Sequence, residues 1–352
     1  QFNDHSLEVL AAHETNERRS NVSAQFKENV IQPGIYTLNN YALSSGPPTG
    51  SSDGSGIESY FGQVNYNYKG KYYLTGSLRT DGSSRFVNDK WGVFGSIGAA
   101  WVMSDEDFMA DNSFVDYLKL KASYGVTGDQ EGVSTASGYT IYNATFVGGG
   151  LSLPEIRPGN PDLTWETSKM LQFGIESTVF NEMFDVNLDY YNKNTDNLFF
   201  NQRRGPSVGF ASILVNDGEV AYNGLEFDVT AHVFKNQDFN LDFTINGEVL
   251  SNEFKAMPID VSTGEQKIID VAGLYAYSVG SSIYDFYMRE WAGVDPADGA
   301  PMWYQYYDDM NDNGVLDAGE AGFVIDDGFG NNLNGTNSLF EYRQKVSDAN
   351  IK

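Results

Sequence analysis

The chain has 352 residues and a net charge of −26, from 48 acidic and 22 basic side chains. Because phosphate binding depends on clustered lysine and arginine, this balance argues against nucleic acid as a partner. The sequence contains no cysteine, which excludes thiol catalysis, disulfide bonds and cysteine-ligated zinc, and its three histidines are too scattered along the chain to suggest a metal cluster.

Alternating hydrophobicity with a period of two predicts long strands over most of the chain before residue 250. Weaker strands are expected near residues 7–13 and 22–26, followed by a two-residue hairpin of long strands that turns at Lys69 and Gly70. The apolar column of this hairpin is Tyr60, Gly62, Val64, Tyr66, Tyr68, Tyr72, Leu74, Gly76 and Leu78.

The same pattern recurs in residues 91–101 and 118–126, and then in two further hairpins at residues 171–190 and 225–249. We count about ten strands before residue 250. No stretch approaches the ~18 consecutive apolar residues of a membrane-spanning helix. If the chain crosses a membrane, it must therefore do so with strands.

Two features favour a transmembrane antiparallel β-barrel over a soluble β-sandwich, which also alternates. The strands are expected to reach about ten residues or more, against about five or six in an ordinary strand. Short turns near Lys69, Asn181 and Lys235 alternate with long connections at residues 80–90, 127–168 and 195–218. Outer-membrane barrels have short periplasmic turns and long extracellular loops. The predicted fold class is therefore all-β, as part of such a barrel.

The polar columns of these strands are expected to face the hydrated lumen of the barrel. Taken one at a time, the same side chains could simply be solvated. The candidates are Gln63, Asn65, Asn67, Arg79, Lys119, Lys121, Asp185, Asp189 and Asp242.

Residues 309–320 read DMNDNGVLDAGE, which fits the calcium-loop pattern at every constrained position. The flanking segments are not amphipathic helices, so we expect a free-standing loop that binds Ca²⁺ as a structural ion. The alternative is a solvated acidic turn that binds nothing. The oxygen ligands are expected from Asp309, Asn311, Asn313, the backbone of Val315, Asp317 and Glu320.

Sugar binding requires aromatic faces beside planar polar groups. The candidate platforms are Tyr139, Tyr142 and Trp165 in the long middle loop, and Trp303, Tyr306 and Tyr307 beside the ion loop. These rings could instead pack against a partner protein or within the loops. No catalytic motif is recognised, so an enzyme is not expected.

Several blocks resemble signature segments of the SusC/RagA-type TonB-dependent outer-membrane transporters of the Bacteroidota. These blocks occur in family order across nearly the whole chain. They begin YFGQVNYNYKG at residue 60, WGVFGSIGAAW at 91, LKLKASYGVTGDQ at 118, NPDLTWETSK at 160 and YNGLEFDV at 222. The segment WAGVDPADGAPMW at residues 291–303 and the DMNDNG loop are also similar to that family.

The resemblance implies a bacterial outer-membrane barrel of about 22 strands around a plug. Residues 1–294 would supply strands and loops, and residues 295–352 an extracellular loop region of the same domain. The implied partners are a SusD/RagB-like surface lipoprotein that acts as a lid, TonB, outer-membrane lipid and a glycan or peptide ligand. No plug or TonB box is recognised, so we expect a fragment, roughly the second half of a barrel short of its final strands.

The leading interpretation is TonB-dependent import of nutrient oligomers, with oligosaccharides preferred over oligopeptides. Two alternatives remain open at this point. One is a TonB-dependent receptor for siderophores or cobalamin, and the other is a non-transporting, calcium-stabilised surface adhesin.

Overall fold

The computed structural model describes residues 4–46, 48–142, 145–148, 150–236, 238–261, 263–272, 274–286, 291–294, 301–307 and 343–348. Strands dominate these residues, which confirms the all-β fold class. The helices within these ranges are short 3-10 turns, and none is long and apolar enough to cross a membrane. They are η1 (Leu38–Asn40), η2 (Met103–Asp105), η3 (Asp107–Met109) and η4 (Pro206–Val208).

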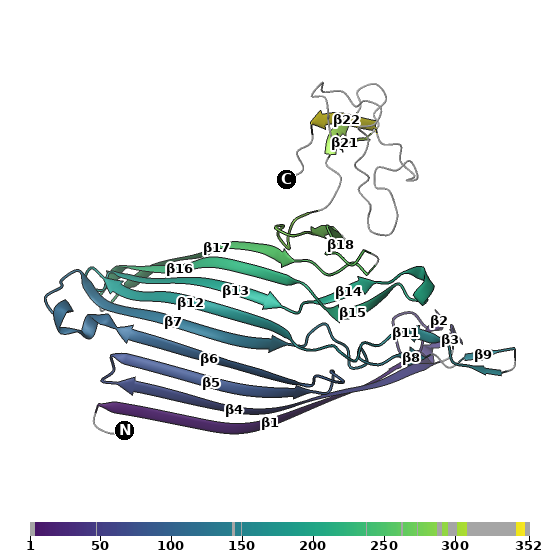
Figure 1. Cartoon of the computed structure of the whole chain (residues 1–352), viewed down its shortest axis with the longest axis horizontal. Coiled ribbons are helices and arrows are strands. Elements are labelled where there is room, and N and C mark those ends of the chain that lie inside the picture. Colours follow the sequence, from purple (N-terminus) through teal and green to yellow (C-terminus); the bar gives the residue numbers. More distant parts are fainter. Residues whose placement is uncertain are drawn as a thin grey trace. The chain divides into compact units, whose positions relative to one another are not determined.

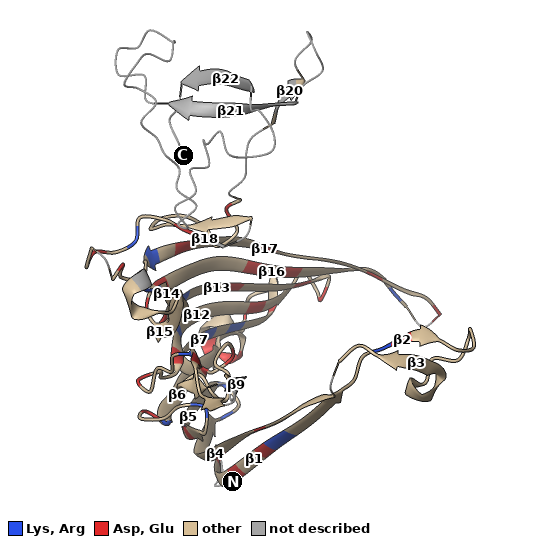
Figure 2. Ribbon diagram, turned by 90° about the vertical axis from the view of Figure 1, so that its right-hand side faces the viewer, with Lys and Arg blue, Asp and Glu red and all other residues tan. Residues whose placement is uncertain are grey.

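Nine long strands form one sheet in the order β1-β4-β5-β6-β7-β12-β13-β16-β17. Figure 1 shows them side by side, from purple β1 at one edge to green β17 at the other, and Figure 2 shows the curvature of the sheet. Their bounds are His5–Ala24 (β1), Thr49–Tyr68 (β4), Tyr72–Ser83 (β5), Trp91–Val102 (β6), Val115–Asp129 (β7), Glu166–Val179 (β12), Phe184–Asp196 (β13), Glu219–Lys235 (β16) and Asn240–Ala256 (β17).

These strands have 12 to 20 residues, so each is longer than the ~9–11 residues that a tilted strand needs to cross a bilayer. Two details differ from the sequence prediction. The two weak strands expected near residues 7–13 and 22–26 belong to the single strand β1. The first hairpin turn has three residues rather than two, because Tyr68 pairs with Tyr72; Lys69 and Gly70 both adopt positive φ there.

Most connections at one end of the sheet are short and most at the other end are long, as predicted; the exceptions are residues 103–114, a longer connection at the short-turn end, and residues 84–90, a shorter one at the other end. The short-turn end holds residues 69–71, 180–183 and 236–239, together with residues 103–114, which contain η2 and η3. The long-loop end holds residues 25–48, 84–90, 130–165 and 197–218. Small hairpins order these loops: Lys27–Val30 (β2) with Tyr41–Ser44 (β3), Ile141–Tyr142 (β8) with Glu155–Arg157 (β11), Thr145–Val147 (β9) with Gly150–Ser152 (β10), and Phe199–Arg203 (β14) with Ser212–Asn216 (β15).

A carboxylate anchors one connection at the short-turn end. Glu106 accepts hydrogen bonds from the Tyr72 hydroxyl at 2.6 Å and the Trp101 indole N–H at 3.1 Å, and Lys71 lies 3.6 Å away. The bond from Tyr72, then that from Trp101 and the charge of Lys71 lower the pKa of Glu106. The carboxylate therefore stays ionised and ties residues 103–109 to the ends of β5 and β6.

Two compact units divide the chain, one of residues 1–251 and 258–265 and the other of residues 252–257 and 266–352. The predicted division at residue 294 stays a prediction. The second unit contains β18 (Asp270–Ala272), β19 (Tyr275–Tyr277), β20 (Trp291–Val294), β21 (Pro301–Tyr307) and β22 (Arg343–Asp348), of which β21 and β22 pair in parallel.

One face of the nine-stranded sheet is apolar and exposed, and we call it the apolar face. Residues directly opposite one another on paired strands share a face. Ile97, on β6, is 57% exposed, and Phe243, on β17, is 60% exposed. A continuous surface of this kind marks a site that lipid or another protein surface covers. One row that crosses eight strands of this face is Leu7, Tyr66, Leu74, Ala99, Ala122, Phe173, Tyr190 and Leu225.

The apolar face predicts unequal effects for the same charge placed on one face of the sheet or on the other. If lipid covers this face, Ile97→Arg should destabilise the protein by about 2–4 kcal/mol because the guanidinium would face hydrocarbon. Ser123→Arg, on the opposite face of the adjacent strand, should have little effect. The measurement is the fraction of folded protein in outer membranes across a urea series; equal losses in both variants would contradict the assignment of the faces.

Candidate functional site

The opposite face of the sheet, which we call the polar face, is the candidate functional site. It is hollowed, with a depression of about 510 Å³ that is lined by residues of seven strands from β1 to β13. Two rows of directly opposed residues cross it. They are Glu8, Asn65, Thr75, Gly98, Ser123, Gln172 and Tyr191, and Asn67, Tyr73, Ala100, Lys121, Gly174, Asp189 and Glu226.

A chain of charges crosses the middle of the polar face. Glu176, on β12, lies 3.1 Å from the Lys119 ammonium and 2.9 Å from that of Lys121, both on β7. Lys121 also lies 3.5 Å from Asp189 on β13, and the Gln172 amide donates to that carboxylate at 3.2 Å. These side chains are only 18–31% exposed, so partial burial makes their mutual pairing worth more than that of fully solvated charges.

Gly174 makes room for this chain of charges. It lies between Lys121 and Asp189 in the row, and a Cβ atom there would stand 2.2 Å from Asp189 Oδ1 and 2.7 Å from Lys121 Cε. Any side chain would displace at least one partner of the ion pair. Because Gly174 has none, the ion pair lies against the wall and the depression stays open.

The lumen candidates on β4 are also held by hydrogen bonds. Asn65 accepts from the Gln63 amide at 3.0 Å and from the Thr75 hydroxyl at 2.7 Å, and Asn67 accepts from the backbone N–H of Gly70 at 2.8 Å. These amides therefore form an ordered wall rather than independently solvated groups.

Arg79 is fixed near the long-loop end of β5. Its guanidinium donates to Asp81 at 2.6 Å, to the Ser59 hydroxyl at 2.8 Å and to Glu14 at 3.3 Å, and it lies over the Phe61 ring at 5.0 Å from the centroid. Asp81 and Ser59 are buried. The arginine therefore joins β1, β4 and β5 by charge-assisted bonds.

The last two lumen candidates, Asp185 and Asp242, share one partner that the sequence analysis missed. His232 contacts both carboxylates. A local signal was present, because His232 and Asp242 are equidistant from residue 237 in a predicted hairpin and must therefore be opposite. Tyr191, likewise missed, lies across Gly224 and donates its hydroxyl to Glu248 on β17.

Trp165, predicted as a substrate platform, lies in an aromatic cluster at the base of the long loops. It is 6% exposed, packs on Phe86 and Phe94 with centroids 5.2 and 5.4 Å away, and donates its indole N–H to the Lys90 carbonyl at 3.1 Å. Val133 and Leu163 complete the cluster. This position fits the alternative role inside the loops and leaves no ring face open to a sugar.

The other predicted site residues belong to a loop, to the second unit or to segments outside the described residues. Tyr139 and Tyr142 are 52% and 57% exposed in the long middle loop. Three further candidates, Trp303, Tyr306 and Tyr307, are residues of strand β21 in the second unit. The predicted calcium ligands lie outside the described residues; they are Asp309, Asn311, Asn313, Val315, Asp317 and Glu320.

Residues 4–337 match the protein family described as TonB dependent receptor-like, beta-barrel. TonB-dependent receptor P26 of Formosa agariphila is 37% identical over 243 residues, which cover 66% of this chain and 23% of that protein. TonB-dependent receptor SusC of Bacteroides thetaiotaomicron is 28% identical over 304 residues, which cover 82% of this chain and 30% of that protein. The chain thus spans less than a third of the length of either relative.

The fold is similar to that of the RagAB peptide importer in its closed-closed state, with a TM-score of 0.73 and 24% identity over 90% of this chain and 34% of that chain. The RagAB peptide transporter gives a TM-score of 0.74, with 24% identity over 86% of this chain and 33% of that chain. Together with the SusC match, these findings confirm the resemblance to SusC/RagA-type barrels.

The aromatic cluster predicts that Trp165 stabilises the loops. We expect Trp165→Ala to cost about 3–5 kcal/mol, because it removes a buried indole and leaves a cavity. The measurement is the rate of protease cleavage within residues 130–165 of the purified protein. Tyr139→Ala, in the same loop but exposed, is the control and should change the rate little; equal effects of the two variants would contradict a structural role for Trp165.

Proposed function

Because the chain belongs to the family of TonB-dependent receptor-like β-barrels, we propose that it forms part of an outer-membrane barrel that imports nutrient oligomers in a SusC-like complex. A SusD/RagB-like surface lipoprotein is the proposed lid, and TonB supplies the energy. The SusC match supports the type of complex, and the fold of RagAB supports the arrangement of the wall.

The observation that supports import best is the division of the sheet into two faces. The apolar face requires lipid, while the polar face carries ordered amides, hydroxyls and paired charges around a depression of about 510 Å³. This division suits a membrane wall with a hydrated interior. The two faces support a hydrated interior, and membership of the TonB-dependent receptor family supports import through it.

An oligosaccharide is the proposed substrate class, with an oligopeptide as the competing outcome. A second hollow of the polar face, of about 400 Å³, is lined by the carboxylates Asp189, Glu226, Asp228 and Glu248. An acidic lining repels anions, which disfavours anionic iron chelates. A neutral glycan is not repelled, and amide and hydroxyl groups such as those of Asn65 and Thr75 suit its hydroxyls.

The loop at residues 309–320 is proposed to bind Ca²⁺ as a structural ion. The support is its sequence alone, because each constrained position carries an oxygen ligand or the turn glycine.

Co-purification and uptake test the proposed function. We expect the protein, solubilised from outer membranes, to bring down a SusD-like lipoprotein with a bound oligosaccharide that mass spectrometry identifies. Cells without the gene, and cells without TonB, should lose uptake of that glycan, whereas cells without TonB should still bind it at the surface. Recovery of a bound peptide instead would show that the substrate is an oligopeptide and not an oligosaccharide. Recovery of a solitary barrel whose loss affects only iron-limited growth or adhesion would contradict import of nutrient oligomers.

A further inference from the structure

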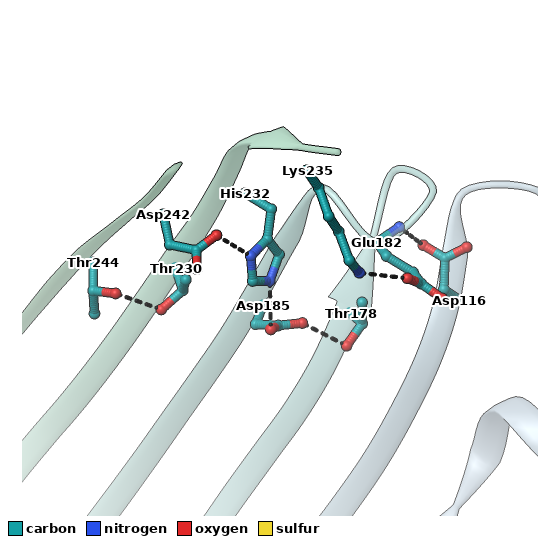
Figure 3. Close-up of polar contacts among 9 residues, drawn as sticks. All are labelled: Asp116, Thr178, Glu182, Asp185, Thr230, His232, Lys235, Asp242 and Thr244. Atoms are coloured by element: carbon teal, nitrogen blue, oxygen red, sulfur yellow. Dashed lines mark hydrogen bonds and ion pairs between the residues drawn. The ribbon is translucent and has the colours of Figure 1, made fainter. Parts of the chain in front are cut away.

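One imidazole bridges three strands at the short-turn end of the polar face. His232, on β16, places Nε2 at 3.0 Å from Asp185 Oδ2 on β13 and Nδ1 at 2.7 Å from Asp242 Oδ1 on β17 (Figure 3). The two carboxylates come from the strands on either side of β16. Both ring nitrogens therefore have an anionic oxygen within hydrogen-bond distance.

This geometry fits only the doubly protonated ring. A neutral imidazole has one N–H, so its other nitrogen would turn a lone pair toward a carboxylate oxygen. Carboxylates at neutral pH only accept hydrogen bonds. In the imidazolium form both nitrogens donate, and both bonds are charge-assisted.

The surrounding charges also favour the imidazolium. Lys235 is the other cation nearby; it pairs with Glu182 at 3.0 Å and also interacts electrostatically with both aspartates that contact His232. Glu182 belongs to the β12–β13 turn, where its backbone N–H donates to Asp116 on β7 at 2.8 Å. Four carboxylates and one lysine thus lie along this end of the sheet: Asp185 and Asp242 contact the ring, whereas Glu182 and Asp116 lie farther along, at the neighbouring turn.

Hydroxyl groups extend the bridge along the end of the sheet. Thr178, on β12, donates to Asp185 at 2.7 Å, and Thr230 and Thr244 are 2.8 Å apart across β16 and β17. The backbone N–H of His232 also donates to the Met183 carbonyl at 2.8 Å, which ties β16 to the neighbouring turn. His232 is thus the central link in a chain of contacts from β12 to β17.

We propose that His232 is a pH-sensitive clasp: as an imidazolium it joins the short-turn ends of β13, β16 and β17, and its deprotonation releases this end of the wall. The sign follows from which form makes the bonds. The charged ring makes both, so the clasp is closed at low pH and opens as pH rises through the range where this histidine loses its proton.

Hydrogen exchange of the whole protein in detergent, measured on residues 239–246 between pH 6 and 9, tests the clasp. After correction for the intrinsic pH dependence of exchange, His232→Gln should raise the exchange rate roughly tenfold at pH 6, because two charge-assisted bonds are lost. The difference from the unmodified protein should disappear by pH 9. Thr230→Val, the matched control, removes an uncharged contact between the same strands, and its effect should be the same at every pH.

Nitrogen-15 NMR of histidine-labelled protein gives a second, direct readout. The His232 signal, identified by its loss in His232→Gln, should show both ring nitrogens protonated at pH 6, and Asp242→Asn should favour loss of one of these protons. A neutral ring at pH 6 in the unmodified protein would overturn the proposal, and so would an effect of His232→Gln that does not depend on pH. Neither measurement involves uptake, so a negative result for the clasp would not count against the import function, and the reverse also holds.

Discussion

The structure depends on the requirement that backbone N–H and C=O groups find partners where water is absent. Each unpaired group costs several kcal/mol in hydrocarbon. Long antiparallel strands meet this requirement, because every interior strand of the sheet is bonded on both sides. The period of two then separates the side chains, so that Ile97 and Phe173 face one way while Ser123 and Gln172 face the other.

Once the faces are separated, the polar face must satisfy its own charges. Many of these contacts run across strands: Lys121 on β7 reaches Glu176 on β12 and Asp189 on β13, and His232 on β16 reaches strands on both sides. Such contacts lie perpendicular to the strands and reinforce the backbone ladder. They also leave room for solute, because glycine at position 174 lets the ion pair lie against the wall.

The connections at the two ends of the sheet are held in place by different interactions. At the short-turn end, a single carboxylate, that of Glu106, ties the connection of residues 103–114 to the ends of β5 and β6. At the long-loop end, connections of many residues need a small core of their own, which Phe86, Phe94 and Trp165 provide. Loops ordered in this way can present exposed rings such as Tyr139 to a partner or ligand while their base stays rigid.

The sequence by itself determined the strands, their two faces and the alternation of short and long connections, because side-chain alternation and turn residues are local properties. It also identified Asp185 and Asp242 as residues of the polar face. Only the tertiary structure decided that His232 also reaches Asp185, since the register of β13 against β16 is set across a 22-residue connection, residues 197–218, that no local pattern describes. The same holds for Trp165, whose burial depends on Phe86 and Phe94, residues far away in the sequence.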